Sequence, residues 1–206
     1  TSKRAPGLSE MTPMSEFDLV EMTDATLPLV QHLRYRVYCA EKQFAMAGAD
    51  HESRLLRDEA DRLGQTYALF DGADLVSSAQ VIPVEVDDPP EKFRLFDLPG
   101  ILPAGTSCVI VSKLVTAPER RGSKTLGPIM RAVLGYVAKG QHRFIAILAE
   151  PQMREFYGSM GFDIRKEGIE APPFGTVSLM VFDMQDERHT SGKSLAGWMF
   201  KSLFAR

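Results

Sequence analysis

Histidine, cysteine and tryptophan are scarce in this sequence of 206 residues, which contains four, two and one of them. The histidines show no metal-ligand spacing, so we expect no metal site. Cys39 and Cys108 both stand in apolar patterns, and we interpret them as buried thiols of a reducing compartment rather than as a disulfide framework. Since no stretch reaches the length of a transmembrane helix and no signal peptide opens the sequence, we expect a cytoplasmic protein.

A strong charge of either sign is missing as well. The formal net charge of −3 implies no general affinity for nucleic acid, so any anion site must be local. Hydrophobic residues make up 44% and charged residues 25% of the chain, which is ordinary for a soluble globular protein that can bury a core. No internal repeat or interdomain linker is visible.

The most informative stretch runs from Thr106 to Val137. Cys108–Thr116 is apolar and β-branched, which predicts a buried strand, and a short basic loop follows at Arg120–Ser123. Apolar residues then recur at helical spacing, which predicts a helix with one buried face. These residues are Leu126, Ile129, Met130, Val133, Leu134 and Val137.

This order of strand, loop and helix directs free backbone N–H groups and the positive end of a helix dipole at an anion. The alternative is a solvated turn that carries two arginines. The side chains that would add charge and hydroxyl donors are Arg121, Ser123, Lys124 and Thr125.

The N-terminal region predicts a strand and then a helix. Phe17–Met22 alternates apolar and polar residues, as strands do. Asp24 or Thr26 can cap a helix that has Pro28 in its first turn. The buried face of this helix is expected to consist of Val30, Leu33, Val37, Ala40 and Phe44.

Polar residues of this region are candidates for a site. Arg34, Tyr38 and Glu41 share a second face of the helix, where they either form a solvated stripe with an ion pair or line a cleft. Asp58 and Asp61 follow in a charged segment.

The next part of the chain predicts a hairpin between two irregular segments. Ala45–Asp61 is small and charged, and we expect a mobile loop. Tyr67–Phe70 and Leu75–Pro83 predict strands around an Asp-Gly turn. Glu85–Gly105 is acidic and proline-rich, and we interpret it as a long excursion that is either a lid or disordered.

The C-terminal half predicts a strand at Arg143–Ala149, a helix from Pro151 to Gly161, and strands at Phe162–Arg165 and Thr176–Met184. The whole pattern predicts an α/β domain with a mixed central sheet flanked by helices. We divide the chain into a flexible arm at 1–15, this domain at 16–186, and a basic apolar tail at 187–206 that is expected to be helical.

The strand, the Arg-Arg-Gly loop and the later segment Phe-Tyr-Gly-Ser-Met-Gly-Phe (156–162) resemble the GNAT acyltransferases, over about residues 17–184. The resemblance implies the GNAT fold and a donor that carries pantetheine. It implies that Tyr157 is a general acid, and that Leu114, Val115 and Thr116 offer backbone N–H groups to an oxyanion. The donor phosphate would lie at the loop formed by Arg121, Gly122, Ser123, Lys124 and Thr125.

The N-terminal residues are similar to a branch of that fold, the acyl-homoserine-lactone synthases and the long-chain N-acyl amino acid synthases; the PEP-CTERM/exosortase-associated acyltransferases also look similar. The resemblance implies acyl carrier protein as the donor, with coenzyme A as the alternative, and no tightly bound cofactor. It implies that the substrate-binding residues are Arg34, Tyr38, Phe44, Asp58, Asp61 and Gln80.

The sequence departs from these families at three places. Lys124 stands where the common loop has a small residue. Residues 110–113 read Ile-Val-Ser-Lys in place of Glu-x-Ser-Arg, so Ile110 stands where those families have a carboxylate. Gln80 replaces an expected arginine. These changes argue against homoserine lactone as the product.

Amide formation from a thioester needs a neutral amine, a stabilised oxyanion and a proton for the leaving thiolate. Tyr157 is the candidate acid, or a packed aromatic side chain. Glu150 is either a base or a first-turn charge of the next helix, and we favour the second reading. Lys113 stands among apolar residues and requires a carboxylate or an open cleft. Asp58 and Asp61 either orient the acceptor amine or belong to a charged loop.

We therefore expect an N-acyltransferase that moves a fatty acyl group from acyl carrier protein or acyl-CoA to the amine of an amino acid or similar molecule. The alternatives are an acetyl-CoA-dependent N-acetyltransferase and a catalytically silent acyl-binding module. The tail, with Trp198, Phe200 and Phe204 among basic residues, either contacts a membrane interface peripherally or packs on the domain or across a homodimer.

Overall fold

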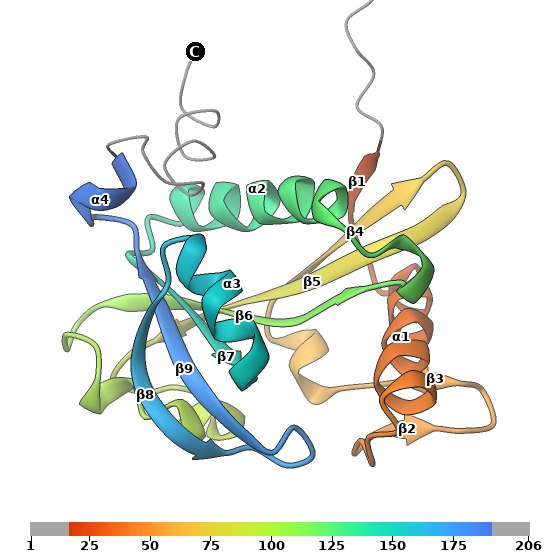
Figure 1. The fold of residues 1–206 in the computed structure, drawn as a ribbon, viewed down its shortest axis with the longest axis horizontal. Helices are drawn as coiled ribbons and strands as arrows, with labels where there is room; N and C mark the ends of the chain where they lie inside the picture. Colours follow the sequence, from red (N-terminus) through yellow and green to blue (C-terminus); the bar gives the residue numbers. More distant parts are fainter. Residues whose placement is uncertain (1–16, 191–206) are drawn as a thin grey trace, which may run out of the picture.

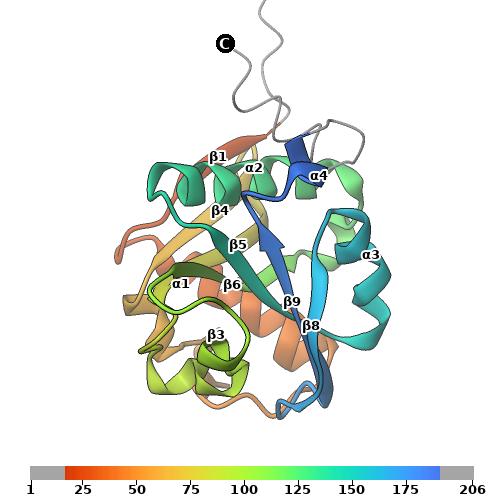
Figure 2. The same ribbon diagram turned by 90° about the vertical axis from the view of Figure 1, so that its left-hand side faces the viewer.

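A computed structural model describes residues 17–190, which form a seven-stranded sheet with helices on both faces (Figures 1 and 2). The strand order is β1-β4-β5-β6-β7-β9-β8, and only β6 and β7 run parallel within it. The prediction of a mixed sheet flanked by helices is confirmed. The strands of this sheet are β1 (Asp18–Glu21), β4 (Gln65–Asp71), β5 (Asp74–Glu85), β6 (Ser107–Thr116), β7 (Phe144–Ala149), β8 (Asp163–Glu170) and β9 (Thr176–Asp183).

The remaining elements are helices, short helical turns and one small hairpin. The helices are α1 (Leu27–Tyr35), α2 (Ser123–Lys139), α3 (Arg154–Ser159) and α4 (Glu187–Thr190). The turns are η1 (Arg36–Glu41), η2 (Glu59–Arg62), η3 (Glu91–Phe96), η4 (Leu98–Gly100), η5 (Pro118–Arg120) and η6 (Pro151–Met153), and the hairpin joins β2 (Ala49–Asp50) to β3 (Leu55–Leu56).

Successive residues of a strand send their side chains to opposite faces of the sheet. In β4, Leu69 packs against Ile129 of α2, whereas Ala68 packs against Val30 of α1. The helices α1 and α2 therefore cover opposite faces. The apolar face of α2 is buried as its spacing predicts, through Ile129, Met130, Val133, Leu134 and Val137.

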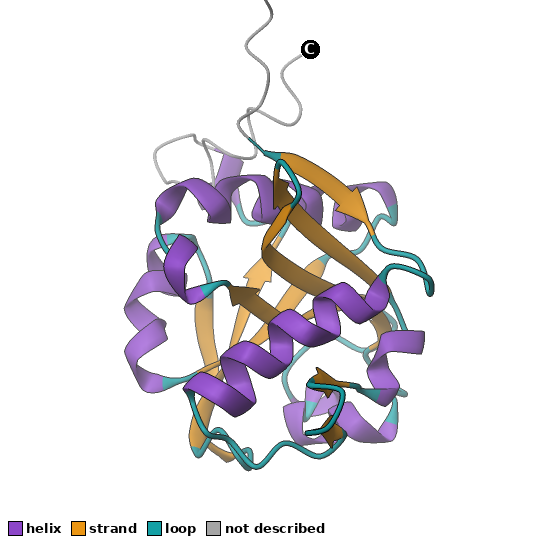
Figure 3. Ribbon diagram, turned by 90° about the vertical axis from the view of Figure 1, so that its right-hand side faces the viewer, coloured by secondary structure: helices purple, strands orange, loops and turns teal. Residues whose placement is uncertain are grey.

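The first helix changes its geometry halfway along. α1 continues directly into the π-helical turn η1, and the two form one long helix across the sheet (Figure 3). Thr26 is its N-cap residue, but the Thr26 hydroxyl accepts from the backbone N–H of Thr23 rather than from the helix. The predicted buried face holds as far as Val37, whereas Ala40 is exposed, because a π turn is wider than the 3.6-residue spacing assumes.

The two segments expected to be irregular contain ordered structure. Residues 45–61 hold the β2–β3 hairpin and the start of η2, which opens with Asp58 and Asp61 in a reciprocal capping box. Residues 85–105 hold η3 and η4. This segment is part of the core and not a lid, since its apolar side chains are buried in the main cluster; they are Phe93, Phe96, Leu98 and Leu102.

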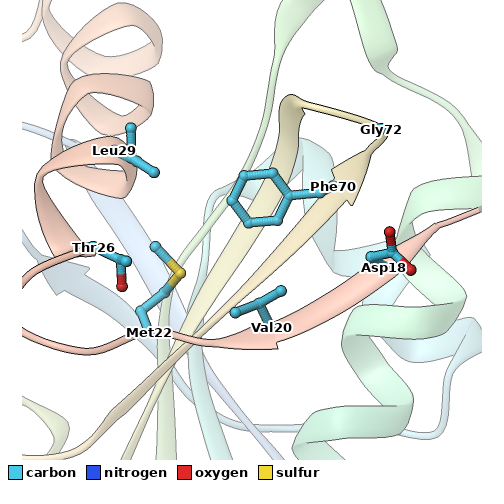
Figure 4. Close-up of a pocket in the computed structure, with 7 residues that line it drawn as sticks. All are labelled: Asp18, Val20, Met22, Thr26, Leu29, Phe70 and Gly72. Atoms are coloured by element: carbon cyan, nitrogen blue, oxygen red, sulfur yellow. The ribbon is translucent and has the colours of Figure 1, made fainter.

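A small open cavity of about 240 Å³ lies at the outer edge of the sheet, between β1, the start of α1 and the β4–β5 turn (Figure 4). Only one of its lining residues is charged, so it offers no group of catalytic side chains. The lining residues are Asp18, Val20, Met22, Thr26, Leu29, Phe70 and Gly72.

Several expectations concern residues beyond this domain. The arm at 1–15 and all but the first residues of the tail at 187–206 lie outside the described residues. Within residues 17–190, no helix is long and apolar enough to cross a membrane. The same residues contain no group of three or more His, Cys, Asp and Glu side chains that could hold a metal ion. Both thiols are free, with Cys108 buried and Cys39 partly exposed.

Candidate active site

The central strand parts from its neighbour beside the basic loop. β6 pairs with β7 at three positions only, the last of which is Ile110 opposite Ala146. On its other side, β6 stays paired with β5 as far as Thr116. Residues 111–116 of β6 therefore have no strand partner on the β7 side. We call these residues, the loop at 117–122 and the first turn of α2 the open edge.

Backbone alternation shows which groups of β6 face the open edge. The N–H group of Ala117 donates to Val76 of β5 at 2.9 Å. Because N–H groups of successive strand residues point to opposite sides, the N–H group of Thr116 points away from β5. Leu114, Val115 and Thr116 were predicted to offer oxyanion donors. The N–H group of Thr116 points to the open side of β6, as that prediction requires. The N–H group of Val115, opposite Ser78, faces β5 instead.

The loop at the open edge leads directly into the start of α2. Gly122 is the N-cap of α2 with φ of 150°, a conformation that favours glycine. No side chain caps the helix, and its first turn contains no acidic residue. The hydroxyl of Thr125 donates to the carbonyl of Gly122 at 3.2 Å, and Lys124 is exposed. The first backbone N–H groups of a helix have no partner within the helix itself, so this turn directs backbone donors toward the loop, as an anion site requires.

Both arginines of the loop are engaged in ion pairs. Arg120 reaches Asp71 at 2.8 Å and Asp74 at 3.4 Å, at the β4–β5 turn. Arg121 holds Glu41 through two bonds of 2.7 and 2.6 Å. The ion pair expected for Glu41 thus exists, but its partner comes from the basic loop.

A set of polar side chains, buried or nearly so except for Lys92 at its rim, gathers around Lys113. We call it the polar cluster; its members are Arg34, Asp58, Asp61, Gln80, Lys92 and Lys113. Arg34 donates to Asp61 at 2.5 Å, and Gln80 donates to Asp61 at 3.2 Å and to the carbonyl of Ala60 at 2.7 Å. Lys113 contacts Asp58 and the side-chain amide oxygen (Oε1) of Gln80, each at 2.9 Å. Lys92 completes the cluster through an ion pair with Asp58.

The strand is distorted at Lys113, which directs this side chain into the cluster. The β5–β6 register shifts between Ser78 and Gln80, and Lys113 has φ of 50°. A non-glycine residue in this region costs of order 1–3 kcal/mol, and such strain clusters at functional sites. Burial and then the like charge of Arg34 lower the pKa of Lys113 to about 8.

The cluster holds more positive than negative charge. Its cations are Arg34, Lys92 and Lys113, whereas Asp58 and Asp61 are its carboxylates. Burial acts to raise the pKa of Asp58, but Lys113 and Lys92 outweigh it and lower that pKa to about 2. The Nε and Nη2 atoms of Arg34 are buried, and no described residue accepts from them. A buried guanidinium with two unused donors is a ready partner for an incoming carboxylate.

The aspartates of this segment point inward although arginines flank them in sequence. The side chains of Asp58 and Asp61 are 15% and 5% exposed. Arg57 turns outward and pairs with Asp50 at 2.9 Å. Ile110, where the related families have glutamate, is fully buried in the apolar core. The lost carboxylate is therefore replaced by core packing and leaves no gap.

Two tyrosines and a glutamate share one electrostatic neighbourhood near the open edge. Tyr157 of α3 packs edge-on against Phe156 and Phe162 at 5.3 and 5.8 Å. Burial, aided by Glu150, raises the pKa of Tyr157 to about 12, so its hydroxyl keeps its proton at neutral pH. Burial, opposed by Arg34, also raises the pKa of Tyr38 above its usual value, with contributions from Tyr157 and Glu150. Tyr157 is thus both a packed aromatic side chain and a proton-bearing group.

Glu150, at the end of β7, is paired with a lysine. Its carboxylate contacts Lys42 at 2.9 Å and also accepts from Gln152. A carboxylate held in this way is less available as a base. Glu150 is the N-cap residue of η6 and makes no side-chain cap hydrogen bond, so it is not the first-turn charge that we favoured.

Sequence reasoning missed one aromatic residue of this region. Phe174, in the β8–β9 turn, packs against Tyr38 at 5.8 Å and against Phe44 at 5.4 Å. The Pro-Pro segment before Phe174 signalled a turn, but nothing in the sequence indicated its contact with the first helix. Lys92 was missed as well, because residues 85–105 were interpreted as a long excursion outside the domain core.

Comparisons with known proteins bear on the family and the fold of the chain. Residues 30–183 match the family model of the N-acyl amino acid synthase FeeM. None of the curated proteins matches the sequence.

Solved structures share the fold at low identity. FeeM, an N-acyl amino acid synthase from uncultured soil microbes, has a TM-score of 0.68 and 12% identity, over 90% of this chain and 99% of that one. BjaI, a CoA-dependent acyl-homoserine lactone synthase, has a TM-score of 0.65 and 13% identity, over 87% of this chain and 82% of that one. A putative N-acetyltransferase from Lactobacillus plantarum has 0.59 and 14%, over 82% and 98%. The predicted GNAT fold is confirmed.

Proposed function

Because the chain belongs to the FeeM family of N-acyl amino acid synthases, it is an acyltransferase, and we propose that it transfers a long-chain acyl group from a pantetheine thioester to the amine of an amino acid or similar molecule. One observation carries the proposal. The open edge and the polar cluster meet at Lys113, so a thioester at one and an amine at the other would lie beside the same stretch of β6.

The open edge suits the phosphate and the thioester of the donor. The N–H groups at the start of α2 would receive the phosphate, and the N–H group of Thr116 would stabilise the oxyanion. The lysine at position 124 and the paired state of both loop arginines favour a donor with a single phosphate. We therefore propose acyl carrier protein as the donor, ahead of acyl-CoA.

The chemistry follows from these positions. The neutral amine attacks the thioester carbonyl, and the N–C bond forms as the oxyanion develops. The C–S bond then breaks, and Tyr157 gives its proton to the leaving thiolate. The attacking nitrogen gives up one proton, which passes through solvent to the tyrosinate oxygen, so Tyr157 is protonated again and the amide and the thiol are the products.

The polar cluster suits an acceptor that carries a carboxylate beside its amine. Its excess of positive charge and the two unused donors of Arg34 would be satisfied by that carboxylate. Asp58 and Asp61 would then keep the amine oriented toward β6.

A product assay tests this proposal. The protein is incubated with dodecanoyl carrier protein and each amino acid in turn, and N-dodecanoyl products are detected by mass spectrometry. We expect an N-dodecanoyl amino acid, and dodecanoyl-CoA should be a poorer donor. Turnover with acetyl-CoA alone would indicate an N-acetyltransferase. Donor binding without any turnover would indicate the silent module, which the buried Ile110 in place of glutamate favours.

A further inference from the structure

Glu41 forms an ion pair with Arg121 of the basic loop, a partner that the sequence did not predict. It ends η1, and its two carboxylate oxygens take both terminal nitrogens of Arg121 at 2.7 and 2.6 Å. Two more ion pairs join the same helix to the surroundings of the open edge. Arg36 contacts Glu119 at 2.8 Å, and Lys42 contacts Glu150 at 2.9 Å.

A carboxylate and a phosphate use the same two-nitrogen face of a guanidinium. A phosphate that approached the start of α2 would need this face of Arg121, which Glu41 already holds. Arg120 is paired as well, with Asp71 and Asp74 at the β4–β5 turn.

We propose that Glu41 is a built-in competitor for the phosphate ester of the pantetheine donor, and that it thereby sets how strongly the basic loop favours phosphorylated donors. The inference rests on the proposed function, since it assumes that the loop receives that phosphate. The shared ligand chemistry is 4′-phosphopantetheine, whether it is attached to a carrier protein or forms part of coenzyme A.

The exposure of the pair makes this exchange feasible. The side chains of Arg121 and Glu41 are 49% and 35% exposed, so solvent screens their attraction and the pair is weak. Arg121 also lowers the pKa of Glu41, which therefore remains charged and competes at neutral pH. A donor without phosphate cannot displace Glu41, whereas a phosphorylated one can.

The test compares two probes that differ only in phosphate. Dissociation constants of 4′-phosphopantetheine and of pantetheine are measured by titration calorimetry on the full chain, and their ratio gives the phosphate preference. Glu41→Gln should raise this preference about two- to fivefold, the range of an exposed ion pair. Arg121→Gln should bring the ratio toward one. The matched control Glu167→Gln removes another ion pair, with Arg154 at 2.7 Å, and should leave the ratio unchanged.

The sign of the Glu41→Gln effect decides the inference. An unchanged or lowered preference would overturn it, and a lowered one would mean that Glu41 holds Arg121 in position for the donor. If the parent protein shows no phosphate preference and Arg121→Gln changes nothing, the proposed donor loop itself is wrong. Holo-carrier protein and coenzyme A are titrated in the same way against the parent and Glu41→Gln. Tighter binding of either by the variant supports the inference and identifies the source of the phosphate.

Discussion

The open edge and the polar cluster are built from opposite kinds of contact. At the open edge, the charged side chains are largely exposed, as Arg121 and Glu41 are at 49% and 35%. In the polar cluster all of them except Lys92 are buried or nearly so, as Arg34 and Asp61 are at 0% and 5%. Exposed pairs are screened and exchange partners easily, whereas a buried charge that loses its partner is strongly destabilising. The open edge can therefore rearrange around a ligand, while the polar cluster is preformed.

The largest effect is expected from breaking the polar cluster. Asp61→Asn leaves the buried guanidinium of Arg34 without its carboxylate, and we expect the free energy of unfolding to fall by about 3–5 kcal/mol. Urea denaturation measures this loss. The matched control Asp50→Asn breaks a pair with Arg57 whose side chains are 35% and 54% exposed, and it should cost much less. Equal losses in the two variants would contradict the contrast between buried and exposed ion pairs.

The next largest effect concerns Tyr157, the partly buried candidate acid on α3. If Tyr157 protonates the thiolate, Tyr157→Phe should retain the fold and the donor affinity but lower the maximal rate by at least about 10²-fold. Steady-state kinetics with saturating substrates give this rate. Tyr136→Phe, on α2, is the control and should keep the parent rate. A rate of Tyr157→Phe within twofold of the parent would leave Tyr157 with a packing role alone.

The pH dependence of stability tests the burial of Lys113. Its pKa is lowered from 10.5 to about 8 in the folded protein, so the unfolded chain binds more protons between these values and stability rises with pH there. We expect a gain of about 1 kcal/mol from pH 7 to pH 9 relative to Lys113→Met, which has no proton to lose. Urea titrations of both proteins at the two pH values measure it. If the free energy of unfolding changes equally with pH in both proteins, Lys113 is solvated and not buried.

The smallest effect is expected at the basic loop. Arg121→Ala removes a phosphate ligand but also frees Glu41, so the loss of donor affinity should lie near the lower end of the 1–3 kcal/mol range for charge-assisted hydrogen bonds, at about 1 kcal/mol. Titration calorimetry with coenzyme A and with holo-carrier protein measures the loss. An unchanged affinity for both would show that the loop does not bind the donor.

The sequence predicted those features that depend on local spacing. The strand at 107–116, the buried face of α2 and the glycine at its start follow from periodicity and backbone chemistry. The resemblance to the acyltransferase families predicted that Arg34, Asp58, Asp61 and Gln80 belong together, and the structure places them in one cluster, although their roles remain proposals.

Contacts between distant segments could not be predicted in this way. Arg121 and Glu41 lie 80 residues apart, and either could equally have faced solvent. Ala40 was misassigned because the sequence gives no sign that the helix widens into a π turn. Phe174 approaches Tyr38 only because the β8–β9 turn folds back toward the first helix.

The most direct test of the whole account is two-substrate kinetics on one variant from each region. The open edge is proposed to take the donor and the polar cluster the acceptor. Arg121→Gln should therefore raise the KM for dodecanoyl carrier protein and leave the KM for the amino acid unchanged. Lys92→Gln, at a residue that belongs to the polar cluster alone, should raise the KM for the amino acid and leave that for the donor unchanged. If both variants raise the same KM, or if the two effects are exchanged, the assignment of the two regions is wrong.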